Sequence, residues 1–97
     1  MSNKNYVRGR NFEYKIKKKY EKKGYIVFRT AGSHSVADLI AIPKLEKIDE
    51  WNPILIQCKA TTKKTYEKEM KELVAVASEY GCRAILETKN KTIKLVI

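Results

Sequence analysis

The chain has 97 residues, a length that suits one domain with a small core, so we expect a single domain over residues 1–97 with residues 1–7 flexible. Its 21 Lys and Arg residues against 11 Asp and Glu residues give a net charge of +10, which predicts a polyanionic partner such as nucleic acid. A lysine-rich, heat-stable protein is the alternative, but that composition raises the acidic residues as well. An apolar fraction of 43% excludes a disordered tail.

The cysteines and the hydropathy exclude two further classes. Cys58 and Cys82 are far apart and form no CxxC pair, which argues against a zinc framework and favours two reduced core residues. No apolar stretch approaches the ~18 residues that a membrane helix needs. The first residues also lack the apolar segment of a secretory signal. We therefore expect a cytoplasmic protein without a membrane partner.

The first half of the chain predicts one helix followed by strands. Phe12, Ile16 and Tyr20 recur every four residues, and this spacing predicts a helix from Arg8 to about Lys23. Strands are expected at 25–31 and 36–42, joined by a turn at 32–35.

The second half begins with a charged loop at 43–53 and a strand at 54–60. A helix at 65–80 follows, with an apolar face formed by Tyr66, Met70, Leu73, Val74, Ala77 and Tyr80. Strands at 82–88 and 91–97 complete the order α-β-β-β-α-β-β. This order predicts an α/β fold with a central mixed five-stranded sheet flanked by helices.

Polar residues interrupt two of the predicted strands. Asp38 lies in the apolar strand 36–42, and Gln57 and Lys59 share one face of the strand 54–60 because side chains alternate. If these strands pair, the three side chains meet at one point. Glu13, at the rim of the first helix's apolar stripe, could lie above that point.

This group of side chains has a chemical interpretation. Asp38, the amide oxygen of Gln57 and a backbone carbonyl are hard oxygen ligands of the kind that Mg²⁺ prefers. Lys59 could stabilise the charge on a phosphate under attack. The alternative is a structural Asp–Lys ion pair at a sheet edge, with Gln57 satisfying a loop. Spacing alone favours this structural alternative, because an Asp followed by QxK is common. The cost of placing polar groups without partners in an apolar sheet supports the functional site, and both interpretations stay open.

One long segment resembles a known family. The run YVRGRNFEYKIKKKYEKKGYIVFRTAGSHSVADLIAI, followed by ILIQCKATTKK, is similar to the archaeal Holliday-junction resolvases of the PD-(D/E)xK nuclease superfamily. The resemblance extends through EYGCRAILE, and RTAGSHSVADLIA is its most specific part. It implies a restriction-endonuclease-like core and a Mg²⁺-dependent endodeoxyribonuclease, with Mn²⁺ as a substitute. It also implies a homodimer that acts on branched DNA, the four-way junction.

The resemblance further implies roles for individual residues. Asp38, Gln57 and Glu13 would hold the metal, and Lys59 would complete the catalytic set. Four residues would contact the DNA backbone, namely Arg8, Arg10, Arg29 and Ser33.

The sequence departs from the family at several points. Gln57 stands where the family has a metal-binding Glu, and Tyr14 where it tends to have Arg. The loop 43–53 is longer than in a minimal resolvase, and we expect its Trp51 to pack rather than to stack on bases. His34 is expected to be a surface loop residue. Two alternatives therefore stay open: a branched-DNA-binding module with a weakened or inactive nuclease site, or a nuclease of the same fold acting on flaps or nicked duplex.

Overall fold

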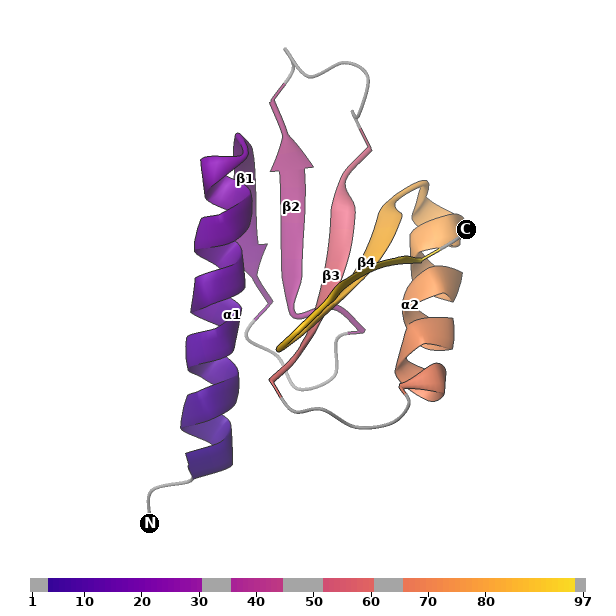
Figure 1. Cartoon of the computed structure of the whole chain (residues 1–97). Helices are drawn as coiled ribbons and strands as arrows, with labels where there is room; N and C mark the ends of the chain where they lie inside the picture. The colour runs from indigo at the N-terminus through magenta and orange to yellow at the C-terminus, as the bar shows by residue number, and fades with distance from the viewer. Residues whose placement is uncertain (1–3, 31–35, 45–51, 61–65, 96–97) are drawn as a thin grey trace.

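The computed structural model describes residues 4–30, 36–44, 52–60 and 66–95, the side chains of residues 4–6 excepted. Two helices and five strands form in these residues (Figure 1). They are α1 (Lys4–Lys22), β1 (Tyr25–Arg29), β2 (Leu39–Pro43), β3 (Ile54–Lys59), α2 (Glu67–Tyr80), β4 (Arg83–Thr88) and β5 (Thr92–Leu95). The predicted order α-β-β-β-α-β-β is confirmed. The predicted turn, most of the loop 43–53, Ser33, His34 and Trp51 lie outside the described residues.

Helix α1 differs from its prediction at its start. It begins at Lys4, four residues before the predicted Arg8. No proline interrupts residues 4–8, so the helix continues for one more turn ahead of its apolar stripe. The helix is 19 residues long. Within the described ranges, no helix is both long and apolar enough to cross a membrane.

The five strands form one sheet in the order β1-β2-β3-β4-β5. Only β3 and β4 pair in parallel, and α2 connects them, while the other neighbours are antiparallel. α1 packs on β1, β2 and β3, and α2 packs on β3 and β4 (Figure 1). The helices cover opposite faces, because Ile54 and Ile56 of β3 belong to the cluster with α1 whereas Leu55 belongs to the cluster with α2.

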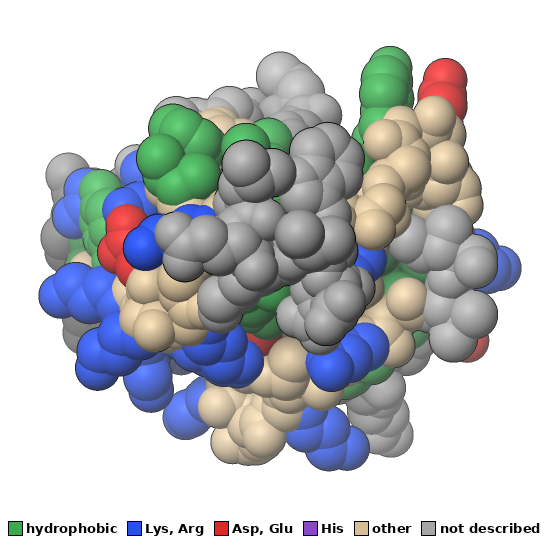
Figure 2. All heavy atoms as spheres, turned by 90° about the horizontal axis from the view of Figure 1, so that it is seen from above, with side chains coloured by type: hydrophobic (Ala, Val, Ile, Leu, Met, Phe, Trp, Pro, Cys, Tyr) green, Lys and Arg blue, Asp and Glu red, His purple; other side chains and the backbone are tan. Residues whose placement is uncertain are grey.

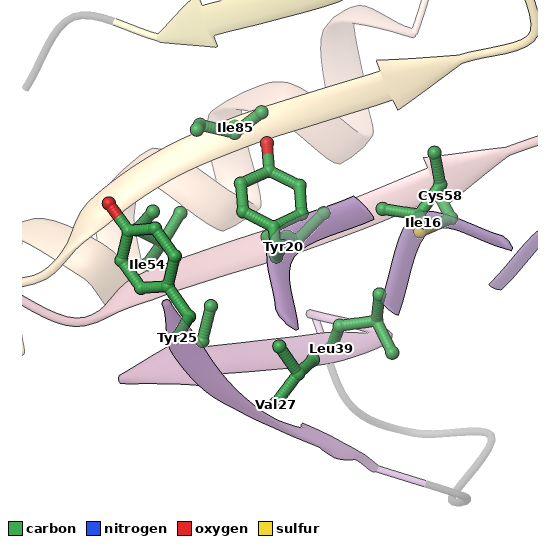
Figure 3. Close-up of a cluster of buried hydrophobic side chains, with 10 residues drawn as sticks. Ile16, Tyr20, Tyr25, Val27, Leu39, Ile54, Cys58 and Ile85 are labelled. Atoms are coloured by element: carbon green, nitrogen blue, oxygen red, sulfur yellow. The ribbon is translucent and has the colours of Figure 1, made fainter. Parts of the chain in front are cut away.

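The core beneath α1 is the larger of the two clusters. Ile16 and Tyr20 of α1 are almost fully buried against Val27, Leu39 and Ile56 (Figure 3 shows this cluster). Burial of each of these apolar side chains contributes about 1.5–3 kcal/mol. The predicted stripe of α1 is therefore the surface that fixes this helix on the sheet.

The core beneath α2 is smaller and ends before the helix does. Leu73 and Ala77 are fully buried, as predicted, but Tyr80 keeps 73% of its surface exposed. The prediction that Tyr80 belongs to the apolar face is therefore wrong. The helix ends there, since Gly81 adopts the left-handed conformation at φ 69° and its N–H bonds to Ser78. Cys82, also expected in the core, is only partly buried, whereas Cys58 is buried.

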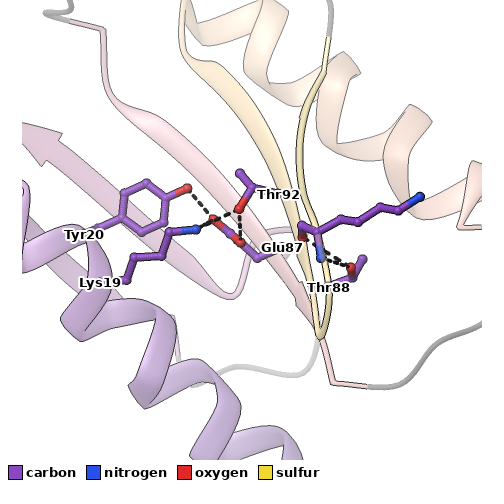
Figure 4. A network of polar contacts seen from close by, with 6 residues as sticks. Lys19, Tyr20, Glu87, Thr88 and Thr92 are labelled. Atoms are coloured by element: carbon purple, nitrogen blue, oxygen red, sulfur yellow. Dashed lines mark hydrogen bonds and ion pairs between the residues drawn. The ribbon is translucent and has the colours of Figure 1, made fainter.

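A buried carboxylate of β4 links this strand to α1 (Figure 4). Glu87 of β4 is only 2% exposed, and its carboxylate accepts hydrogen bonds from the Tyr20 hydroxyl at 2.6 Å, Lys19 Nζ at 2.9 Å and the Thr92 hydroxyl at 2.7 Å. Burial, and then the Glu87 carboxylate, raise the pKa of Tyr20 above its ordinary value. The hydroxyl therefore stays protonated and acts as a donor to a buried charge.

Replacing Tyr20 with Phe should destabilise the fold, because it removes one of the donors that stabilise the buried Glu87 carboxylate while keeping the ring in the core. We expect the free energy of unfolding to fall by about 2 kcal/mol. Urea unfolding followed by circular dichroism measures this. Tyr80→Phe, at an exposed position, is the matched control and should change stability by less than about 0.5 kcal/mol. Equal effects of the two variants would contradict the assigned role of the Tyr20–Glu87 bond.

Candidate active site

Asp38 lies where β2 and β3 diverge. It falls in a bend immediately before β2 and not within a strand, so its predicted place in a strand over 36–42 is corrected. Its N–H still donates to the Ile56 carbonyl at 2.8 Å. Its Oδ2 accepts the Cys58 N–H at 2.8 Å, so a carboxylate replaces a backbone carbonyl beside β3. β2 begins only at Leu39, since at Asp38 a side chain and not a backbone carbonyl accepts the bond from β3.

Gln57 contacts the same carboxylate. Its Nε2 donates to Asp38 Oδ2 at 3.1 Å. The predicted meeting of Asp38 with Gln57 therefore occurs, but the amide presents its nitrogen and not its oxygen. To ligate a metal through Oε1, the Gln57 side chain must turn its amide over, at the cost of this hydrogen bond.

The surroundings of Asp38 raise the pKa of its carboxyl group above the ordinary value. Burial is the main cause that raises the pKa of Asp38, and the Glu13 carboxylate raises it further. The Cys58 N–H opposes this shift, as do the charges of Lys59 and Arg29. Glu13 of α1, Arg29 of β1 and Lys59 of β3 thus influence the pKa of one carboxylate.

Lys59 is the last residue of β3 and lies on the same face as Gln57. Its Nζ is 3.8 Å from Glu69 Oε2 and 5.6 Å from the centre of the Tyr66 ring, and both partners come from the start of α2. Glu69 was not predicted as a site residue, because no sequence pattern distinguishes it from the other Glu residues of this helix. Tyr66 was expected only as a core residue.

Glu13 and Arg29 form a second charged pair beside the site. Arg29 Nε donates to Glu13 Oε1 at 2.8 Å, and its guanidinium lies 5.1 Å from the centre of the Tyr14 ring. The ring of Tyr14 therefore contributes to the site, at the position where the family tends to have Arg. Arg8 is exposed and Arg10 half-exposed, one turn before Glu13 on α1.

The oxygen atoms of Asp38 and Gln57 are ligands that suit a weakly bound hard cation. Within the described part of the chain, no group of three or more His, Cys, Asp or Glu residues could hold a metal. The pair Asp38 and Gln57 offers one carboxylate and one amide, both with oxygen atoms, and no described residue donates a hydrogen bond to Asp38 Oδ1. Because Mg²⁺ keeps several of its waters when bound by one or two protein groups, this small set fits it, with low affinity.

Asp38→Asn should stabilise the metal-free protein at neutral pH, because it removes a buried charge and keeps an oxygen that can accept the Cys58 N–H. Since the folded-state pKa of Asp38 is raised, the folded state binds the proton more tightly than the unfolded state does. The wild-type free energy of unfolding should then rise as the pH falls from neutral through that pKa, and its deficit against the variant should close. Urea unfolding in a chelator at several pH values measures both stabilities. A variant that is less stable than the wild type at neutral pH would contradict the cost assigned to this carboxylate, and the exposed Glu79→Gln serves as control.

Comparison of the sequence with known proteins gives one family. The profile of the family Mrr_cat, described as a restriction endonuclease, matches residues 5–93. A curated relative, the crossover junction endodeoxyribonuclease Hjc of Methanocaldococcus jannaschii, is 31% identical over 87 residues. The match covers 87% of this chain and 60% of the relative, so the chain spans less than two thirds of that relative's length.

Comparison of the structure agrees with this family. Hjc of Archaeoglobus fulgidus, a Holliday junction resolvase, superposes with a TM-score of 0.62 at 20% identity, over 87% of this chain and 67% of that one. At this identity the likeness concerns the fold, and it confirms the predicted restriction-endonuclease-like core. The resemblance to the archaeal resolvases that the motifs indicated is also confirmed. The chain belongs to the Mrr_cat family of restriction endonucleases.

Proposed function

We propose that this protein is a metal-dependent, structure-selective endodeoxyribonuclease that resolves four-way DNA junctions by phosphodiester hydrolysis. The observation that carries the proposal is the hydrogen bond between Gln57 and Asp38 at 3.1 Å, in a chain of a nuclease family. Lys59 lies on the same face of β3 as Gln57. Hjc of Methanocaldococcus jannaschii, a relative in sequence, is a crossover junction endodeoxyribonuclease, and this favours a junction as substrate.

Each side chain has a separate task in this proposal. Asp38 and Gln57 would hold Mg²⁺, or Mn²⁺ in its place, and Glu13 would add negative charge nearby. When bound, the ion supplies Lewis-acid polarisation of the scissile phosphate and lowers the pKa of a coordinated water. Lys59 would stabilise the negative charge that builds on the phosphate oxygens.

The charged surface fits a DNA backbone. Exposed Lys residues lie along α1 and directly after it, among them Lys15, Lys18, Lys22 and Lys23. Figure 2 shows Lys and Arg side chains mainly at the left and along the lower edge of the molecule in this view. Arg8 and Arg10 lie on the half of α1 that extends past the end of β1 (Figure 1), and Arg29 lies beside Asp38. Such contacts position DNA without reading its sequence, which suits recognition of branch shape. Ser33 is proposed as a fourth contact on the family resemblance alone.

We further propose a homodimer, since a junction presents two strands for paired cuts. The face of β1 and β2 opposite α1 supports this. It exposes Ile26, Phe28 and Ile42 at 57%, 51% and 39%, and neither described helix covers it. An exposed group of large apolar side chains of this kind is typical of protein interfaces. The +10 net charge opposes self-association, so an interface free of Lys is expected.

A second candidate function is a branched-DNA-binding module without cleavage. Gln57 favours it, because an amide brings no negative charge to the metal and here offers its nitrogen to Asp38. The retained Glu13, Asp38 and Lys59 favour an active enzyme instead. A nuclease acting on flaps or nicked duplex would use the same residues.

Cleavage of a labelled four-way junction with Mg²⁺ or Mn²⁺ tests the proposal. We expect symmetric cuts by the wild type, at least about 100-fold slower cuts by Asp38→Ala, and little cleavage of linear duplex. Junction binding by Asp38→Ala, measured by gel shift, shows that the variant is folded. Binding without cleavage by the wild type would support the binding module, and equal activity on linear duplex would overturn the junction assignment.

Gln57→Glu should tighten metal binding and destabilise the metal-free protein. It replaces the Nε2–Asp38 hydrogen bond by two adjacent carboxylates, so we expect a loss of about 1 kcal/mol of stability in chelator. Added Mg²⁺ should stabilise this variant more than the wild type, because two carboxylates replace one. Thermal unfolding with and without Mg²⁺ measures both effects, with Asn90→Asp, the same charge change in an exposed turn, as control. No difference between Gln57→Glu and its control would remove Gln57 from the metal site.

A further inference from the structure

We propose that Glu69 and Tyr66 are positioning residues that hold the Lys59 ammonium over the site and keep it away from Asp38. This inference rests on the proposed nuclease function and assigns two further residues to it. Neither belongs to the catalytic set indicated by the motifs.

Two contacts restrain the ammonium group of Lys59. Lys59 Nζ lies 3.8 Å from Glu69 Oε2 and 5.6 Å from the centre of the Tyr66 ring. Tyr66 is only 6% exposed, so its ring is a fixed surface. The chain leaves β3 at Lys59 and returns at Tyr66 to begin α2, which places both partners beside the lysine.

Lys59 needs such partners because of its own flexibility. A lysine side chain is a compact charge on a four-carbon stem, and its ammonium can reach several acceptors. The Lys59 and Glu69 side chains keep 27% and 36% of their surface exposed, so their ion pair adds little to stability. Its effect is on direction, since the pair and the ring together limit where the ammonium can point.

Asp38 is the competing acceptor. Gln57 donates to Asp38, and Lys59 lies two residues further along the same face of β3, about 7 Å from Gln57. Without Glu69, the carboxylates left near the ammonium would be Glu13, which is paired with Arg29, and Asp38. A direct Lys59–Asp38 pair would occupy the oxygens proposed for the metal and withdraw the lysine from the phosphate. Glu69 thus pairs with the Lys59 ammonium and leaves the Asp38 carboxylate for the proposed metal.

Single-turnover cleavage of a four-way junction across a Mg²⁺ series tests the inference. For Glu69→Gln we expect about a tenfold lower maximal rate, because the lysine is misplaced, and a higher Mg²⁺ concentration at half-maximal rate. Junction affinity, measured in Ca²⁺ without cleavage, should match that of Glu72→Gln. This control lies on the same helix, is exposed and makes the same change of charge. A Glu69→Gln variant with the rate and Mg²⁺ requirement of Glu72→Gln would overturn the proposal.

A second measurement does not depend on cleavage. The ¹⁵N signal of the Lys59 ammonium, assigned by its loss in Lys59→Met, reports the order of the side chain. We expect an ordered ammonium in the wild type and in Glu72→Gln, and a more disordered or displaced one in Glu69→Gln and Tyr66→Leu. An unchanged signal in both would show that neither residue holds the lysine. If the wild type does not cleave any junction, the proposed function fails while this measurement still decides the positioning.

Discussion

The hydrogen bond from the Cys58 N–H to the Asp38 carboxylate, at 2.8 Å, is the constraint on which the site depends. Backbone pairing between β2 and β3 brings Leu39 opposite Ile56, and the next donor along β3 finds a side chain instead of a backbone carbonyl. This substitution coincides with the start of β2 and fixes a carboxylate beside β3. Gln57 and Lys59 follow in register because they belong to the strand that supplies the donor.

The second constraint is the seating of α1. Ile16 and Tyr20 bury its apolar stripe, and Tyr20 extends through the core to the buried Glu87 on β4. A buried carboxylate without partners would be costly, so the position of α1 along the sheet is specified by these donors as well as by apolar packing. Once α1 is seated, Glu13 lies beside Arg29 at the end of β1, and both act on Asp38.

The two helices cover the two faces of the sheet unequally. This separates the basic surface of α1 from the exposed apolar surface of β1 and β2. α1 covers three strands on one face, whereas α2 covers β3 and β4 on the other and leaves Ile26, Phe28 and Ile42 exposed. The basic residues of α1 and this apolar surface therefore lie on opposite sides of the sheet. A DNA backbone and a second protein chain could be bound without competing for the same residues.

The sequence by itself determined the element order, the buried stripe of α1 and the meeting of Asp38 with Gln57. These follow from local periodicity: a spacing of four residues marks a helix face, and alternation places Gln57 and Lys59 on one side of a strand. The motif RTAGSHSVADLIA is a contiguous run, so its resemblance to the family is also visible without the tertiary structure.

Only the tertiary structure decided which partner each polar group takes. That Gln57 offers nitrogen to Asp38, that Glu13 pairs with Arg29, and that Glu69 contacts Lys59 depend on side chains from different elements meeting in space. The burial of Glu87 and the exposure of Tyr80 have the same origin, because both depend on where a helix ends relative to the sheet. Periodicity reports the face on which a residue lies, whereas its partner is set by packing between segments that are distant in the chain.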